Sequence, residues 1–174
     1  MKLRSLVISL VVGLTTVGCG ASTEPPRTDD VSEDASAANV SALDSLPEKN
    51  VDGLDVCAAL SGEAVARAVG STLVDTRVHA VGVNCVYDLG SPRQAVVVSV
   101  KDRMTYDAVR KLAESFEKPV EDLSGIGVAA YTKESADHDR QVWTIRDDGL
   151  VLSVQARDQQ WAEAVAKLAL DSMP

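Results

Sequence analysis

Residues 141–156 read QVWTIRDDGLVLSVQA, and this stretch decides the fold. Asp148-Gly149 is a strong signal for a two-residue hairpin turn, because Gly adopts the positive φ that such turns require. The flanking runs, 141–147 and 150–156, are rich in the β-branched and apolar residues that strands favour. The stretch therefore predicts two antiparallel strands joined directly by a tight turn.

Four other stretches have strand character, namely 72–79, 83–89, 94–101 and 128–133. Within 83–89 the apolar residues fall at every second position, which is typical of a strand with one buried face. Cys85 belongs to that inward set. A loop is expected over 121–127, before the last of these four strands.

Three helices are predicted from apolar spacing and capping residues. The first begins after Ser61 and stops at Gly70, the second spans 105–117 and stops before Pro119, and the third begins after Asp158. Ser and Asp side chains cap helix N-termini, Gly ends helices, and Pro cannot continue one. The buried stripe expected on the second helix consists of Tyr106, Val109, Leu112, Ala113 and Phe116.

The order helix, three strands, helix, three strands, helix predicts an α+β fold. Short turns between successive strands favour antiparallel pairing, and helices cover the apolar side of such a sheet. We therefore expect an antiparallel sheet of about five to six strands with three helices mainly on one face. The 124 residues of 51–174 have the length of a single domain, large enough for one core without a metal.

The first 18 residues have the layout of an export signal. A basic start precedes a short apolar run, 6–14, which has the length of a secretory h-region. Thr16-Val17-Gly18-Cys19 then resembles the lipobox of bacterial lipoproteins, with Thr in place of the usual Leu. The alternative, a transmembrane anchor, needs about 20 apolar residues, more than this segment contains. We expect 1–18 to be a removed signal peptide and Cys19 to be lipidated.

Lipidation of Cys19 predicts a protein anchored to the cell membrane on its extracytoplasmic face, because two or more acyl chains hold a protein stably without a span. Residues 19–50 are then expected to form a disordered acidic tether, since they are rich in Ser, Ala and Thr and carry seven acidic and two basic residues. The domain, 51–174, is also acidic overall. No nucleic-acid partner is expected, because such binding needs a basic surface.

Two cysteines remain once Cys19 is assigned to the lipid. An exported chain reaches an oxidising compartment, where such pairs usually join, so we expect a disulfide between Cys57 and Cys85. The alternative is a redox or metal-binding pair. It is weaker because the spacing is not C-x-x-C and because His79 and His138 do not cluster with the cysteines in the sequence.

Residues 55–61 (DVCAALS) and 84–87 (NCVY) resemble a large family of uncharacterised actinobacterial lipoproteins. The resemblance extends through 123–129 (LSGIGVA) and the final strand pair and helix. The chain departs from the family's usual Pro, Leu and Asp at Val56, Ala59 and Val128. The resemblance implies a lipid-anchored domain with one disulfide and no established activity. A more distant likeness to the extracytoplasmic sensor domains of bacterial Ser/Thr kinases suggests ligand or partner sensing by fold analogy.

No complete set of catalytic residues is apparent, so we expect that the protein is not an enzyme. Acyl transfer needs a nucleophile, a base and an orienting acid brought together, and His79 and His138 are the only histidine bases. Asp137 and Asp139 flank His138, but three adjacent loop residues cannot easily converge on one metal ion. We therefore assign no catalytic, cofactor-binding or metal-ligating residue.

Three other features have structural explanations. The Asp147-Asp148 pair belongs to the hairpin turn described above. Gly125-x-Gly127 lacks the third glycine and the following helix of a dinucleotide site, and it predicts a backbone turn instead. Trp143 and Trp161 each fall in the periodic pattern of their element, so both are assigned to the core.

These observations predict a lipid-anchored extracytoplasmic module that binds or senses an unidentified partner protein or small molecule. An envelope-acting enzyme or enzyme accessory is the first alternative, and an inhibitor-like or structural cell-surface lipoprotein is the second. An enclosed apolar pocket would indicate a small ligand, and an exposed apolar patch would indicate a protein partner. A cleft that joins a titratable side chain to oxyanion donors would indicate an enzyme.

Overall fold

The computed structural model describes residue 43 and residues 45–79, 83–90, 94–115 and 119–174. Over these residues the chain forms an α+β domain with four helices and one antiparallel sheet of seven strands. In chain order the elements are α2 (Val56–Ala59), α3 (Gly62–Ala68), β1 (Leu73–His79), β2 (Asn84–Leu89), β3 (Ala95–Lys101), α4 (Arg103–Ser115), β4 (Val120–Leu123), β5 (Ala129–Glu134), β6 (Arg140–Ile145), β7 (Val151–Ala156) and α5 (Gln159–Ser172). Cys19 and the predicted signal peptide lie outside the described residues.

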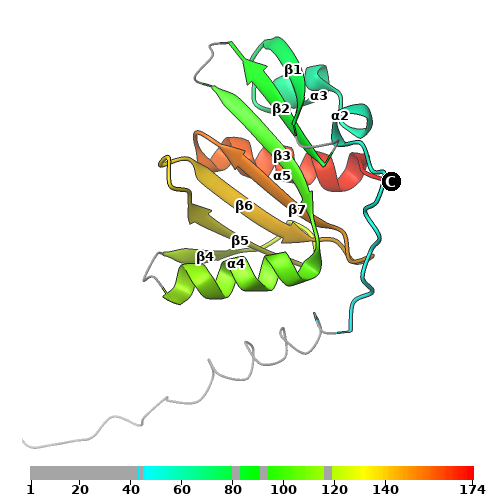
Figure 1. Cartoon of the computed structure of the whole chain (residues 1–174). Coiled ribbons are helices and arrows are strands. Elements are labelled where there is room, and N and C mark those ends of the chain that lie inside the picture. The colour runs from blue at the N-terminus through cyan, green and yellow to red at the C-terminus, as the bar shows by residue number, and fades with distance from the viewer. Residues whose placement is uncertain (1–42, 44, 80–82, 91–93, 116–118) are drawn as a thin grey trace, which may run out of the picture.

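The sheet joins the two halves of the chain at its centre (Figure 1). Its strand order is β1-β2-β3-β7-β6-β5-β4, and all neighbouring strands are antiparallel. β3 from the first half pairs with β7 from the second, so that Val98 lies opposite Val154. β7 is buried at nearly every position because it lies near the middle of the sheet, between β3 and β6.

Helices cover both faces of the sheet, three on one face and α4 on the other. α5 packs on β6 and β7, α3 packs on α5 and on β1 and β2, and α2 contacts β2. α4 covers the β4–β6 end from the opposite side (Figure 1). Because successive strand residues point to opposite faces, Val142 belongs to the core under α5, whereas Trp143 belongs to the core under α4. The sheet thus separates two cores.

The predicted hairpin between β6 and β7 is confirmed, but its turn consists of three residues, 147–149, and not of the predicted two. The N–H of Arg146 donates to the carbonyl oxygen of Leu150 at 2.9 Å, and Gly149 has a φ of 84°. Gly149 is required for a second reason as well. A Cβ at this position would collide with the carbonyl oxygen of Pro47, because the segment that precedes the domain crosses the turn here.

The predicted number of strands, five to six, is wrong, because the described sheet has seven. The additional strand is β4, which lies in the stretch predicted to be a loop. Its outer residues, Val120 and Leu123, are partly buried, and the two acidic residues between them are exposed, so the strand has no period-two pattern. β4 is a strand because all four of its residues pair with β5.

The predicted number of helices, three, is also too low for the described residues. α2 is a single turn that the sequence pattern missed, and Asp55 caps it by accepting a hydrogen bond from the Ala58 N–H at 3.1 Å. α4 begins earlier than predicted because Asp102 accepts the Thr105 N–H at 2.6 Å. The predicted caps Ser61 and Asp158 are both confirmed.

Candidate functional site

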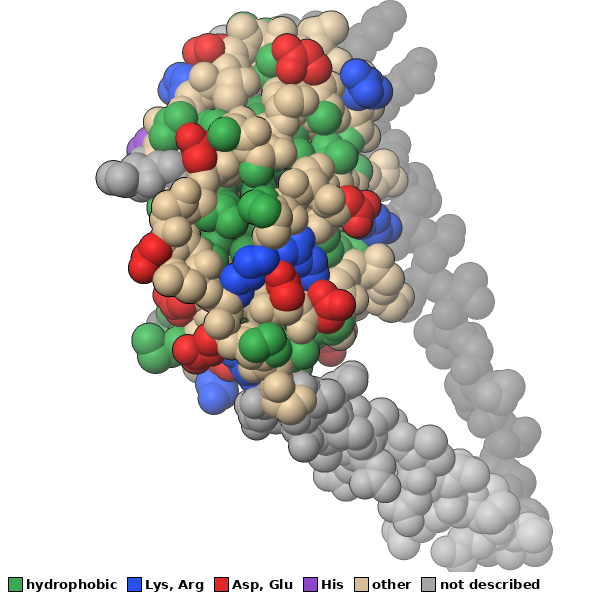
Figure 2. Space-filling model, turned by 90° about the vertical axis from the view of Figure 1, so that its right-hand side faces the viewer, with side chains coloured by type: hydrophobic (Ala, Val, Ile, Leu, Met, Phe, Trp, Pro, Cys, Tyr) green, Lys and Arg blue, Asp and Glu red, His purple; other side chains and the backbone are tan. Residues whose placement is uncertain are grey.

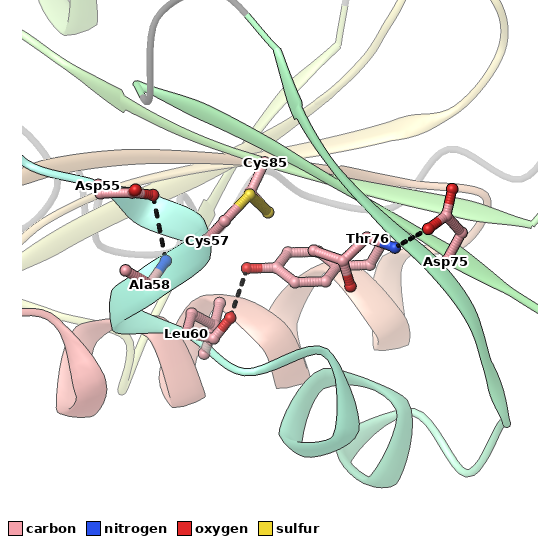
Figure 3. Close-up of a disulfide and its surroundings, with 8 residues drawn as sticks. Asp55, Cys57, Ala58, Leu60, Asp75, Thr76 and Cys85 are labelled. Atoms are coloured by element: carbon pink, nitrogen blue, oxygen red, sulfur yellow. Dashed lines mark hydrogen bonds between the residues drawn. A yellow bond between two sulfur atoms is a disulfide. The ribbon is translucent and has the colours of Figure 1, made fainter.

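The Cys57–Cys85 disulfide is present and ties α2 to β2 (Figure 3). Cys85 is fully buried, as its place in the inward set predicts. Next to it, the hydroxyl of Tyr87 donates to the carbonyl oxygen of Leu60 at 2.8 Å, at the end of α2. Burial, with a smaller contribution from the carboxylate of Asp55, raises the pKa of Tyr87 well above its ordinary value. The bond and the disulfide together fix α2 on the sheet.

The two histidines do not converge. His79 ends β1 at one edge of the sheet, while His138 lies in the turn between β5 and β6, so β2, β3 and β7 separate them. The His138 side chain is 88% exposed and its Nδ1 is hydrogen-bonded to Oε1 of Glu134. Asp139 accepts a hydrogen bond from Gln155 instead. Among the described residues, no three His, Cys, Asp or Glu side chains are placed to hold a metal ion.

Asp148 belongs to an ion-pair cluster that holds the end of α5. Its carboxylate accepts hydrogen bonds from Arg146 and Lys49, each at 2.6 Å. Arg146 also donates to the carbonyl oxygens of Leu170 and Met173 at 2.9 and 2.7 Å, and a cation is favourable at a helix C-terminus. The hydrogen bond from Arg146 is the main reason that the pKa of Asp148 lies well below its usual range. Partial burial acts to raise this pKa, and the hydrogen bond from Lys49 acts to lower it further.

The side of the molecule that carries the C-terminus is seen in Figure 2. Acidic and basic side chains lie beside one another below a central group of hydrophobic side chains. The structural role predicted for the carboxylates at the hairpin is confirmed for Asp148, which accepts the N–H of Leu150 within the turn and a hydrogen bond from Lys49 in the segment before the domain. Its partner Arg146 makes the bonds to the end of α5.

The segment from Gly125 to Gly127 is a backbone turn, as predicted. Both glycines have positive φ, 74° and 62°, and a Cβ at Gly127 would collide with the carbonyl oxygen of Ile145. That carbonyl accepts the N–H of Val128 at 2.8 Å, and the buried hydroxyl of Thr144 donates to Ile126 at 3.0 Å. β5 follows the turn, so the segment lacks the helix that a dinucleotide site requires.

Trp143 lies in the core, as predicted, within an aromatic cluster under α4. Its ring is stacked with that of Tyr131 at a centroid distance of 6.3 Å, and Tyr106 packs edge-on against Tyr131 at 5.0 Å. The guanidinium of Arg110 lies 5.6 Å from the Tyr131 ring centroid. Burial raises the pKa of Tyr106 to about 12. Trp161, in contrast, is only partly buried against the other core.

A groove lies between α4 and the segment that precedes the domain. It has a volume of about 640 Å³ and is open to solvent. Leu46, Met104 and Ala108 give it an apolar part, and charged residues complete the lining: Glu48, Arg103, Asp107 and Lys111. Leu46 also packs on the aromatic cluster, and its carbonyl oxygen accepts a hydrogen bond from Arg103 at 3.1 Å. The last described residues of the predicted tether thus form one wall of the groove.

α4 has a second apolar stripe, on the side that faces solvent. Met104, Ala108 and Leu112 follow one another at four-residue spacing, and Met104 and Leu112 are 78% and 57% exposed. Leu112 was predicted to be buried, and that prediction is wrong, because it belongs to this outward stripe and not to the inward stripe of Tyr106 and Ala113. The four-residue spacing from Met104 to Leu112 is the sequence signal for this outward stripe, although it does not show that Leu46 packs beside it.

The groove differs from a typical small-molecule site. Small-molecule sites usually bury most of the ligand surface, whereas this groove is open. Its two cationic and two anionic residues leave it without a strong charge of either sign. Neither His79 nor His138 lines it. An exposed, flexible methionine suits a surface that adapts to a partner protein.

Comparison with known proteins adds no relative. No protein-family model, curated protein or solved structure matches this chain. The resemblance to actinobacterial lipoproteins therefore stays a prediction. Within the described part of the chain, no helix is both long enough and apolar enough to cross a membrane.

Proposed function

We propose that the protein is a lipid-anchored extracytoplasmic binding module that receives a segment of a partner protein in the groove on α4. The observation that carries the proposal is the exposed apolar surface of α4, where Met104 and Ala108 form an open groove with Leu46. Contiguous exposed apolar surface on a soluble domain is typical of an interaction site. The mixed charges at the groove favour an amphipathic partner segment of low net charge.

The position of the groove fits a protein on a tether. One wall is built by Leu46 and Glu48, which belong to the segment, 19–50, predicted to run from the lipid at Cys19 to the domain. A partner seated in the groove would contact both the domain and the end of the tether. Binding would then involve the segment that leads from the anchor to the domain, which is a simple way for such a module to sense a partner.

A substitution at Met104 tests the proposal. Met104→Glu places a charge in the apolar part of the groove and is expected to abolish capture of the partner when the protein is cross-linked and purified from its own membranes. Val128→Glu is the matched control, because Val128 is 51% exposed but does not line the groove. If both variants are folded and both retain the same captured protein, the groove is not the binding surface.

Cys19→Ser tests the anchor. The variant is expected to leave the membrane fraction, and it should lose the partner only if that partner resides at the membrane. Intact-mass analysis of the wild-type protein should give a chain that begins at Cys19 and carries acyl mass. A chain that retains Met1, or that begins elsewhere, contradicts the anchor.

A double variant distinguishes the binding module from the envelope enzyme. Replacing His79 and His138 together with Ala is expected to leave the cellular phenotype unchanged, because the two side chains are exposed and lie in separate parts of the sheet. If the double variant loses function while it remains folded and anchored, the enzyme alternative replaces the binding module.

A further inference from the structure

β1 is an edge strand with an open outer side. It pairs with β2 alone among the described strands, and all its residues after Leu73 are exposed. Val74 and Val78 are 63% and 58% exposed. An edge strand presents unpaired N–H and C=O groups, which makes it a template for another strand. The N–H of Thr76 donates at 2.8 Å to the side chain of its neighbour, Oδ1 of Asp75, and not to another strand (Figure 3).

The opposite edge of the sheet does not offer the same opportunity. β4 has only four residues, and its two central side chains, Glu121 and Asp122, are both acidic. Arg110 from α4 already holds Asp122 at 2.8 Å. Two copies of β4 would bring like charges together, which destabilises strand pairing. β1 carries one charge of each sign, Asp75 and Arg77, on the same side of the strand.

We propose that β1 pairs antiparallel with β1 of a second copy of this chain, with Thr76 opposite Thr76. The two sheets then continue into one another across a two-fold axis, as in an isologous dimer. The outer N–H of each Thr76 donates to the second copy, and its former acceptor, Asp75, is released for a new partner. This surface is separate from the groove on α4.

The charges of β1 select this register. A two-fold axis perpendicular to the sheet leaves each side chain on the same face in both copies. Residues that stand opposite one another must share a face, so the axis must pass beside a residue that faces its own copy. A shift one way sets Asp75 against Asp75, and a shift the other way sets Arg77 against Arg77. Only the register centred on Thr76 sets each Asp75 against Arg77 of the other copy, twice over.

The contacts that Asp75 and Arg77 make within one copy are compatible with pairing to a second copy. Asp75 lies 4.0 Å from Arg77 within one copy, so it is already in the field of a guanidinium. Arg77 makes two hydrogen bonds to Asp88 on β2, at 2.8 and 2.9 Å, which orient it on the sheet. The β-bulge at Val74 lies outside the central pairs. In this register Val78 stands opposite the bulge of the other copy, so exposed valine surface meets at both ends.

Cysteine cross-linking, combined with charge-reversal variants, tests the dimer. In the full chain, in its own membranes, Thr76→Cys is expected to give a disulfide-linked dimer on a non-reducing gel, since residue 76 of one copy lies opposite residue 76 of the other. Glu121→Cys, on the β4 edge, is the matched control and should remain monomeric. Added to Thr76→Cys, either Asp75→Arg or Arg77→Asp should reduce the dimer at least fivefold, because each sets like charges together.

The double variant Asp75→Arg/Arg77→Asp should restore the dimer, because it recreates the complementary pairs with exchanged signs. The thermal midpoint of each variant shows that the domain remains folded. The proposal is overturned if the single variants cross-link as well as their parent, if the double variant stays as low as the single ones, or if Glu121→Cys cross-links equally.

Discussion

The two ends of the sheet are stabilised in different ways. At the β4–β6 end, helices pack on both faces, and Tyr106, Tyr131 and Trp143 fill the space under α4. At the β1–β2 end, helices cover one face only, and the outer strand is exposed along most of its length. That end has the disulfide between α2 and β2. The difference indicates that a covalent bond supports the end where two-sided packing is lacking.

Trp143→Ala is expected to give the largest loss of stability. Trp143 is 4% exposed and stacks on Tyr131, and removing a buried aromatic side chain costs about 3–5 kcal/mol in unfolding free energy. Trp161→Ala, at a half-buried position in α5, is the matched control and should cost clearly less. Urea denaturation measures both. Equal losses would show that the aromatic cluster is not the main support of its end.

Loss of the disulfide should have the next largest effect, and it should be local. The double variant Cys57→Ser/Cys85→Ser removes a cross-link between residues that are 28 positions apart in the sequence. In the chain-entropy model, such a cross-link stabilises the folded state by about 3–4 kcal/mol. Under native conditions, amide hydrogen exchange in the variant should be faster than in wild type for β1 and β2. The exchange that β5 and β6 show through local opening should stay unchanged. Uniform acceleration over the whole sheet would contradict the separation of the two ends.

Asp148→Asn should have the smallest effect of the three, and one that depends on pH. The folded-state pKa of Asp148 is lowered, above all by the hydrogen bond from Arg146, so its contribution is fully present above the ordinary Asp pKa of about 4 and is lost as the pH falls below it. The side chain is 36% exposed, so the cost at pH 7 is about 1 kcal/mol or less.

Wild type and Asp148→Asn should therefore converge progressively in unfolding free energy as the pH falls below about 4. Asp147→Asn is the matched control at the neighbouring position. A difference between wild type and Asp148→Asn that grows on acidification would mean that the cluster does not hold the carboxylate in its charged form.

Local patterns account for much of this fold. Asp148-Gly149 predicts the hairpin, Ser61 and Asp158 predict two helix starts, and the alternation around Cys85 predicts its burial. Each of these signals depends on a few neighbouring residues and on backbone preferences that do not need the rest of the chain. The disulfide is predicted on other grounds, from the cysteine number and from the export signal expected at the start of the sequence.

The features that sequence reasoning missed depend on distant contacts. β4 is a strand only because β5 lies beside it, and its own residues show no strand pattern. Leu112 has the same apolar character as Val109, and only the packing of α4 decides which of the two faces solvent. The groove combines Leu46 with Met104, which are far apart in the chain. Its location could not be read from either segment alone.

Site-specific photo-cross-linking in the intact envelope tests the central claim, that the α4 groove binds a partner protein. A photoreactive residue at Met104 is expected to give one adduct with a different polypeptide, whereas the same residue at Val128, which is exposed but outside the groove, should give none. Adducts at both positions, or at neither, from folded and membrane-bound protein would contradict the claim that this groove is the binding surface.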